Sequence, residues 1–130
     1  MSAHLPGIFK KLRALKAPIC QYKVCSTFDS GPQVGSIGRA LEIGKEVFGA
    51  GFVPIVPAAP QLKRYVIFSN LFAGDEEEIH RIDRHPAMSR HPVTPMIESD
   101  LRLHLAKQTT RGVKSLNMPL RLAPQRRPIC

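Results

Sequence analysis

The stretch YVIFSNLF, Tyr65–Phe72, is nearly all apolar and is rich in β-branched and aromatic residues. A strand that is apolar on both faces is typical of a parallel sheet with helices packed on both sides. The stretch therefore predicts a strand that is buried on both faces of a mainly parallel sheet.

The segments around this stretch alternate between strand-like and helix-like patterns. Further strands are predicted at Gln21–Thr27, Phe52–Val56 and Glu78–Asp83. Helical spacing of apolar residues predicts helices at Ala3–Lys16, Gln33–Phe48 and Thr94–Gln108. In the last of these, Ile97, Leu101 and Leu105 are expected to face inward. This order predicts an α/β domain of three layers.

The positive charge is concentrated near the C-terminus. The chain of 130 residues has a net charge of +9, which would suit nucleic acid or an acidic surface. Seven of the 19 basic residues and none of the 10 acidic residues follow residue 100, which leaves 12 basic and 10 acidic residues in positions 1–100. Aromatic residues make up only 6% of the chain, so few bases could be stacked. Nucleic-acid binding is therefore the weaker alternative.

The cysteines and the apolar runs indicate a cytoplasmic protein with no membrane partner. Cys20, Cys25 and Cys130 are odd in number and lack framework spacing, as expected for free thiols in a reducing compartment. No apolar run approaches the roughly 18 residues of a membrane span. The basic start, Met1–Lys16, is not followed by the apolar stretch of a signal peptide.

The first segment rich in polar groups is Tyr22–Arg39, where a predicted strand leads into a glycine-containing turn and a helix. Ligands bind at such strand ends, and a helix N-terminus favours anions. Lys23 could supply a positive charge, and Asp29 could accept a hydrogen bond from a substrate hydroxyl. Alternatively, Asp29 only caps the turn and the glycines only allow close packing. The glycine spacing matches neither a P-loop nor a dinucleotide fingerprint.

The second such segment is Arg81–Met96, a proline-rich loop with three arginines and two histidines. Arginine binds carboxylates with two parallel hydrogen bonds. Thr94 is expected to cap the following helix, with Pro95 in its first turn, which would offer a second anion site. The alternative is a solvated basic loop in which Asp83 pairs with an arginine.

Other residues carry weaker signals. The histidines of the chain do not have the spacing of a helical metal site, so no metal site is predicted. Cys25 has no base assigned to it by the sequence, and no catalytic residue is assigned.

Both polar segments resemble the four-carbon acid sugar kinase family, in its N-terminal domain. The resemblance extends from about Leu5 to about Thr109. It is carried by the motifs at Tyr22–Ser30, Val34–Ala40, Arg64–Tyr65, Asn70–Ala73 and Arg81–Met96.

Members of this family phosphorylate small sugar acids such as threonate and erythronate with ATP and Mg. Their N-terminal domain mainly holds the acid, and a second domain, which we expect this chain to lack, mainly holds ATP. The resemblance implies that ten residues lie at or near the sugar-acid pocket: Lys23, Ser26, Thr27, Asp29, Arg39, Arg84, His85, Arg90, His91 and Thr94. In our hypothesis Lys23 or Arg90 pairs with the substrate carboxylate, and Asp29 and His91 bond its hydroxyls.

The chain also departs from the family pattern. It has no counterpart of the opening strand that ends in Asp-Asp-Phe-Thr-Gly, so the sheet is expected to be incomplete at its N-terminal edge. The likeness is expected to end after Gln108, which gives a partial domain at residues 1–109 and a basic, disordered tail at residues 110–130. We expect a kinase fragment that is inactive alone. The alternatives are a non-catalytic sugar-acid-binding protein, a homo-oligomer, and a chain completed by a separate ATP-binding chain.

Overall fold

The computed structural model describes residues 4–75 and 77–116. Within them, three α-helices and three β-strands follow one another in the order α1 (Leu5–Ala14), α2 (Ile37–Phe48), β1 (Arg64–Ile67), β2 (Asn70–Gly74), β3 (Ile79–Arg81) and α3 (Leu101–Ala106). Short 3-10 turns occupy Pro60–Leu62, Ile82–Arg84 and Met88–Arg90.

The sheet is antiparallel, so the prediction of a three-layer domain with a mainly parallel sheet is wrong. Its strand order is β1-β2-β3, and each strand pairs antiparallel with its neighbour. The run at 65–72 is a hairpin and not one strand, because the chain reverses at Phe68 and Ser69, whose φ angles are +47° and +71°. Positive φ at both central residues matches the tight turn that suits the twist of a hairpin. The turn was missed because neither residue is the Gly or Asn that normally marks it.

The strands predicted at 21–27 and 52–56 do not form. Both runs are irregular, and neither is paired with another strand among the described residues. The side chains of Phe52 and Val56 are each 80% exposed. A β-rich run becomes a strand only when a partner accepts its backbone hydrogen bonds.

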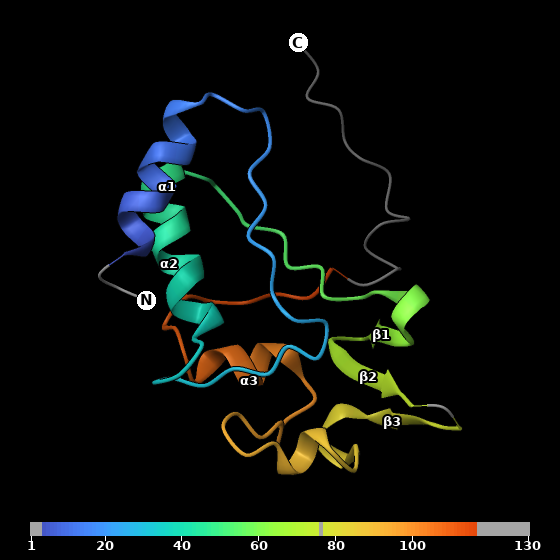
Figure 1. Ribbon diagram of the computed structural model, residues 1–130. Coiled ribbons are helices and arrows are strands. Elements are labelled where there is room, and N and C mark those ends of the chain that lie inside the picture. The colour runs from blue at the N-terminus through green and yellow to red at the C-terminus, as the bar shows by residue number, and fades with distance from the viewer. Residues whose placement is uncertain (1–3, 76, 117–130) are drawn as a thin grey trace.

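The first two helices lie side by side (Figure 1). The ring of Phe9 in α1 lies 5.8 Å from the ring of Phe48 in α2. Helix α2 starts at Ile37, four residues after the predicted start, because Ser36 caps it by accepting a hydrogen bond from Arg39 N. It ends as predicted, with Gly49 in the left-handed conformation.

The predicted helix at Thr94–Gln108 is shortened to α3. Asp100, and not Thr94, is the N-cap, because its side chain accepts from Arg102 N at 2.9 Å. The preceding residues are extended and lie along β2, where Leu71 N donates to Ser99 O at 2.9 Å. Leu101 and Leu105 are buried as predicted, but Ile97 is 68% exposed.

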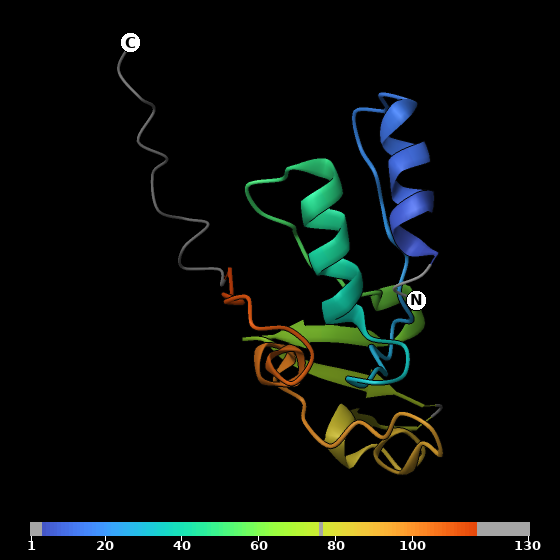
Figure 2. The same ribbon diagram turned by 90° about the vertical axis from the view of Figure 1, so that its left-hand side faces the viewer.

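The core lies between the hairpin, α3 and the start of α2. It contains Phe28, Ile37, Leu71, Ala73, Ile82, Met96, Leu101 and Leu105. Figure 2 shows α1 and α2 on one side of the β1–β2 hairpin and the segment around residues 82–97 on the other. Both polar segments therefore reach this core, in which Phe28 of the first and Ile82 and Met96 of the second are buried.

None of the helices in the described part of the chain has the length and apolar character required to cross a bilayer. Residues 110–116 form neither helix nor strand. Most of the predicted basic tail, residues 117–130, lies outside the described residues.

Candidate functional site

The first polar segment is held in place by Phe28, whose side chain is fully buried in the core. Its backbone has a φ of +58°, and its N–H donates to Cys25 O at 3.0 Å. Such strained backbone persists only where surrounding contacts enforce it, and it is common at functional sites. Phe28 therefore anchors the turn that presents its neighbours Thr27 and Asp29.

The carboxylate of Asp29 joins the two polar segments. Thr27 Oγ1 donates to Asp29 Oδ1 at 2.5 Å, and Thr94 Oγ1 donates to Asp29 Oδ2 at 3.1 Å. Cys25 Sγ lies 2.9 Å from Thr27 Oγ1. Partial burial works to raise the pKa of Asp29, but the hydrogen bonds from Thr27 and Thr94 outweigh it and lower the pKa. Asp29 is therefore an ionised acceptor at neutral pH.

The histidines of the second segment shape its loop. His85 Nδ1 accepts from Ala87 N at 3.2 Å and from Met88 N at 3.3 Å. His91 Nδ1 accepts from Thr94 N at 3.0 Å. A neutral imidazole whose Nδ1 accepts carries its proton on Nε2, so each ring keeps one N–H donor while it supports the loop. Burial lowers the pKa of His85 and favours its neutral form.

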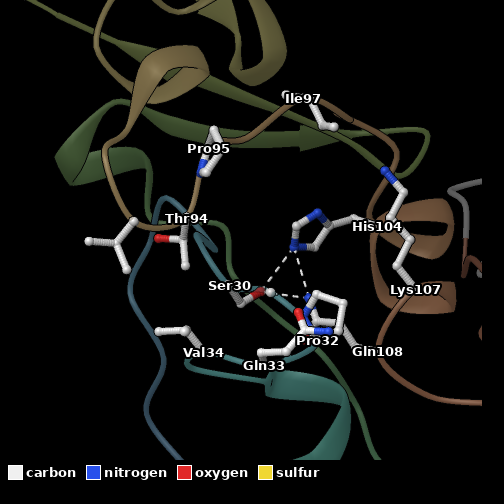
Figure 3. A pocket seen from close by; sticks show the side chains of 12 residues that line it. Ser30, Pro32, Gln33, Val34, Thr94, Pro95, Ile97, His104, Lys107 and Gln108 are labelled. Carbon is white, nitrogen blue, oxygen red and sulfur yellow. Dashed lines mark hydrogen bonds between the residues drawn. The ribbon is translucent and has the colours of Figure 1, made fainter.

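A pocket of about 240 Å³ lies beside Thr94. It is lined by residues 30–34, by residues 93–95 and 97, and by His104, Lys107 and Gln108 of α3 and its C-terminal end. Figure 3 shows the side chains of these segments converging around this space. Thr94 both lines the pocket and binds Asp29, so the pocket and the Asp29 cluster adjoin.

A buried polar cluster forms one wall of the pocket. Gln108 Nε2 lies 2.9 Å from Ser30 Oγ and 3.0 Å from His104 Nε2, and Ser30 Oγ lies 2.9 Å from His104 Nε2 (Figure 3). Burial and then the charge of Lys107 lower the pKa of His104, so its ring is neutral at neutral pH. None of these residues was among the predicted site residues. The usable signal was the spacing of His104 and Gln108, four residues apart on one helical face.

Of the ten predicted site residues, only Thr94 lines this pocket. Lys23, Arg84 and Arg90 are exposed, and Ser26 is half-buried. Arg39 Nη1 donates to Glu42 at 2.9 Å, and Glu42 in turn accepts from Thr109 at 2.6 Å. The structure thus brings together Thr27, Asp29, His91 and Thr94 from the ten predicted residues, with His85 supporting their loop.

The start of α2 was expected to offer free N–H groups to an anion, but its first turn is already occupied. Gly38 N donates to Gln108 Oε1 at 3.2 Å, and Arg39 N donates to Ser36 Oγ at 3.1 Å. This helix end therefore does not have the form of a phosphate cradle.

A model of the family described as "Sugar-binding N-terminal domain" matches residues 1–127. The chain therefore belongs to this family, which confirms its resemblance to the N-terminal domain of four-carbon acid sugar kinases. The match also extends beyond Gln108, where we expected the likeness to end.

The curated relatives are kinases. Over 118 residues the chain is 58% identical to a "3-oxo-isoapionate kinase" of Paraburkholderia graminis, an alignment that covers 91% of this chain and 25% of that protein. Over 102 residues it is 34% identical to a "3-oxo-tetronate kinase" of Burkholderia multivorans, covering 76% and 22%. A "3-oxo-tetronate kinase" of Haemophilus influenzae is 34% identical over 80 residues, covering 62% and 18%. The chain thus spans a quarter or less of the length of these relatives.

Proposed function

We propose that this chain binds a small sugar acid, of the threonate or erythronate type, and holds it for ATP-dependent phosphorylation by a larger protein. The observation that carries the proposal is the Asp29 carboxylate, which hydroxyls from both polar segments hold in one orientation. Each carboxylate oxygen can accept more than one hydrogen bond. Asp29 can therefore still accept from a substrate hydroxyl, and the Nε2–H of His91 is a second group for such a hydroxyl.

The names of the relatives support this substrate class. They are named as kinases of 3-oxo-isoapionate and of 3-oxo-tetronate. Both names denote oxidised sugar acids. Both 3-oxo-tetronate and threonate therefore serve as probes. Phosphoryl transfer depends mainly on positioning and on charge stabilisation, and this part of the protein would supply the position of the acceptor.

The family resemblance implies that ATP and Mg are held mainly by a second domain. The first turn of α2 is capped by Gln108 and Ser36, which leaves no phosphate cradle there. No group of three or more His, Cys, Asp or Glu side chains that could hold a metal ion occurs among residues 4–75 and 77–116. We therefore assign both to the remainder of the full-length kinase or to a complementing chain, and expect the isolated chain to bind without turnover.

The test is calorimetric titration of the 130-residue chain with threonate, erythronate and 3-oxo-tetronate. Asp29→Asn should weaken binding by about tenfold or more, because a hydrogen bond to a charged group contributes about 1.5–3 kcal/mol. Asp83→Asn is the matched control, since Asp83 is also a hydrogen-bonded carboxylate but pairs with Arg81 away from the cluster. If no sugar acid binds, or if both variants bind like the wild type, the proposal is wrong.

A further inference from the structure

The pocket beside the Asp29 cluster has a wall whose hydrogen bonds can be traced atom by atom. Gly38 N is an obligatory donor, so Gln108 presents its carbonyl oxygen to Gly38 and its amide group to the opposite side. That amide group can only donate, and it lies 3.0 Å from His104 Nε2 and 2.9 Å from Ser30 Oγ, whose own hydroxyl lies 3.0 Å from the acceptor Phe28 O. Where Gln108 donates to His104, Nε2 is an acceptor and the neutral ring carries its proton on Nδ1; where Ser30 donates to Phe28 O, Nε2–H donates to Ser30 Oγ instead.

The Nδ1 atom of His104 faces the pocket. Figure 3 shows it on the side of the ring away from Ser30 and Gln108, toward Ile97. No hydrogen-bond partner of Nδ1 occurs among the described residues, yet Nδ1 is not one of their fully enclosed unsatisfied atoms. With Nε2 as the acceptor, the imidazole offers an Nδ1–H donor to a molecule in the pocket, while the rest of its side chain is buried.

The ammonium of Lys107 lies on the same side of the pocket, also toward Ile97 (Figure 3). It makes no hydrogen bond or ion pair within residues 4–75 and 77–116. A neutral N–H donor beside a cation suits an oxyanion, because both groups interact with its negative charge. The carboxylate of Asp29 accepts from Thr94 Oγ1 but does not line the pocket, and as a hydrogen-bond acceptor it suits hydroxyls.

We propose that the pocket binds the carboxylate end of the sugar acid, with His104 Nδ1–H and Lys107 Nζ as its donors, while Asp29 and His91 bind the hydroxyl end. This inference rests on the proposed function and gives the substrate a direction in the site. It assigns the carboxylate to α3 and its C-terminal end, and not to Lys23 or Arg90, which are exposed and do not line the pocket.

The test is an NMR titration of the ¹⁵N-labelled 130-residue chain with threonate and with threitol, which has the same carbon skeleton without the carboxylate. The imidazole spectrum should show the Nδ1–H tautomer for His104, and threonate should shift its signals. Lys107→Met should weaken threonate binding by about tenfold, toward the affinity for threitol. Lys107 is exposed, so this variant should keep the fold, and Lys11→Met on α1 is the charge-matched control.

The outcomes separate the two proposals. An Nε2–H tautomer of His104 would overturn the inference even without ligand. If Lys107→Met bound threonate as tightly as Lys11→Met, the carboxylate would lie elsewhere, and the proposed function would stand without this inference. If the wild-type chain bound no sugar acid, both would be overturned.

Discussion

Two glycines of α2 make a matched pair for testing how closely α2 approaches the end of α3. An ideal Cβ at Gly38 would lie 2.7 Å from Gln108 Cβ and 2.8 Å from the Gln108 carbonyl carbon. A Cβ at Gly44 would meet only the ring of Phe9, at 3.4 Å. Both substitutions to alanine remove a helical glycine, which by itself favours the helix by about 1 kcal/mol.

The expected effects on stability have opposite signs. At Gly38, overpacking against the backbone of Gln108 costs about 1–3 kcal/mol, and losing the hydrogen bond from Gly38 N to Gln108 Oε1 costs about 1 kcal/mol more. Gly38→Ala should therefore lower the free energy of unfolding by about 1–3 kcal/mol. Gly44→Ala should raise it by about 1 kcal/mol or less.

The assay is urea unfolding of both variants and the wild type, followed by circular dichroism. At about 4 °C per kcal/mol for a chain of this length, the two variants should also differ clearly in Tm. If Gly38→Ala were as stable as Gly44→Ala, the close contact between α2 and Gln108 would not exist. The pocket wall built on that contact would then lose its support.

Three further predictions concern the site, the turn and pH. Thr94→Val keeps the side-chain shape but removes the donor to Asp29, so it should cost about 1 kcal/mol of stability and weaken threonate binding severalfold, as read by urea unfolding and calorimetry. Left-handed backbone costs a non-glycine residue about 1–2 kcal/mol, so replacing Phe68-Ser69 by Asn-Gly should raise the urea midpoint, and an unchanged midpoint would contradict the assigned turn. Burial lowers the pKa of His104 below its ordinary 6.5, so the unfolded chain binds more protons there and stability should fall as pH drops below about 6.5. His104→Gln should flatten that pH dependence, and an equally steep dependence in the variant would assign it to other groups.

Local sequence determined the features that depend on near neighbours. Apolar spacing located α1 and α2, and Gly49 marked the end of α2 because a left-handed C-cap favours glycine. The family motifs carried Thr27, Asp29, His91 and Thr94, which the structure brings together.

Only the tertiary structure decided the direction of the sheet and the wall of the pocket. An apolar run has the same composition whether it is one buried strand or a hairpin, and a turn at Phe68 and Ser69 is enforced by cross-strand pairing and not by its own residues. Ser30, His104 and Gln108 are ordinary polar residues until segments more than 70 positions apart place them within hydrogen-bond distance. Sequence spacing indicates contacts within one helix or strand, whereas a pocket depends on how several helices, strands and loops pack together.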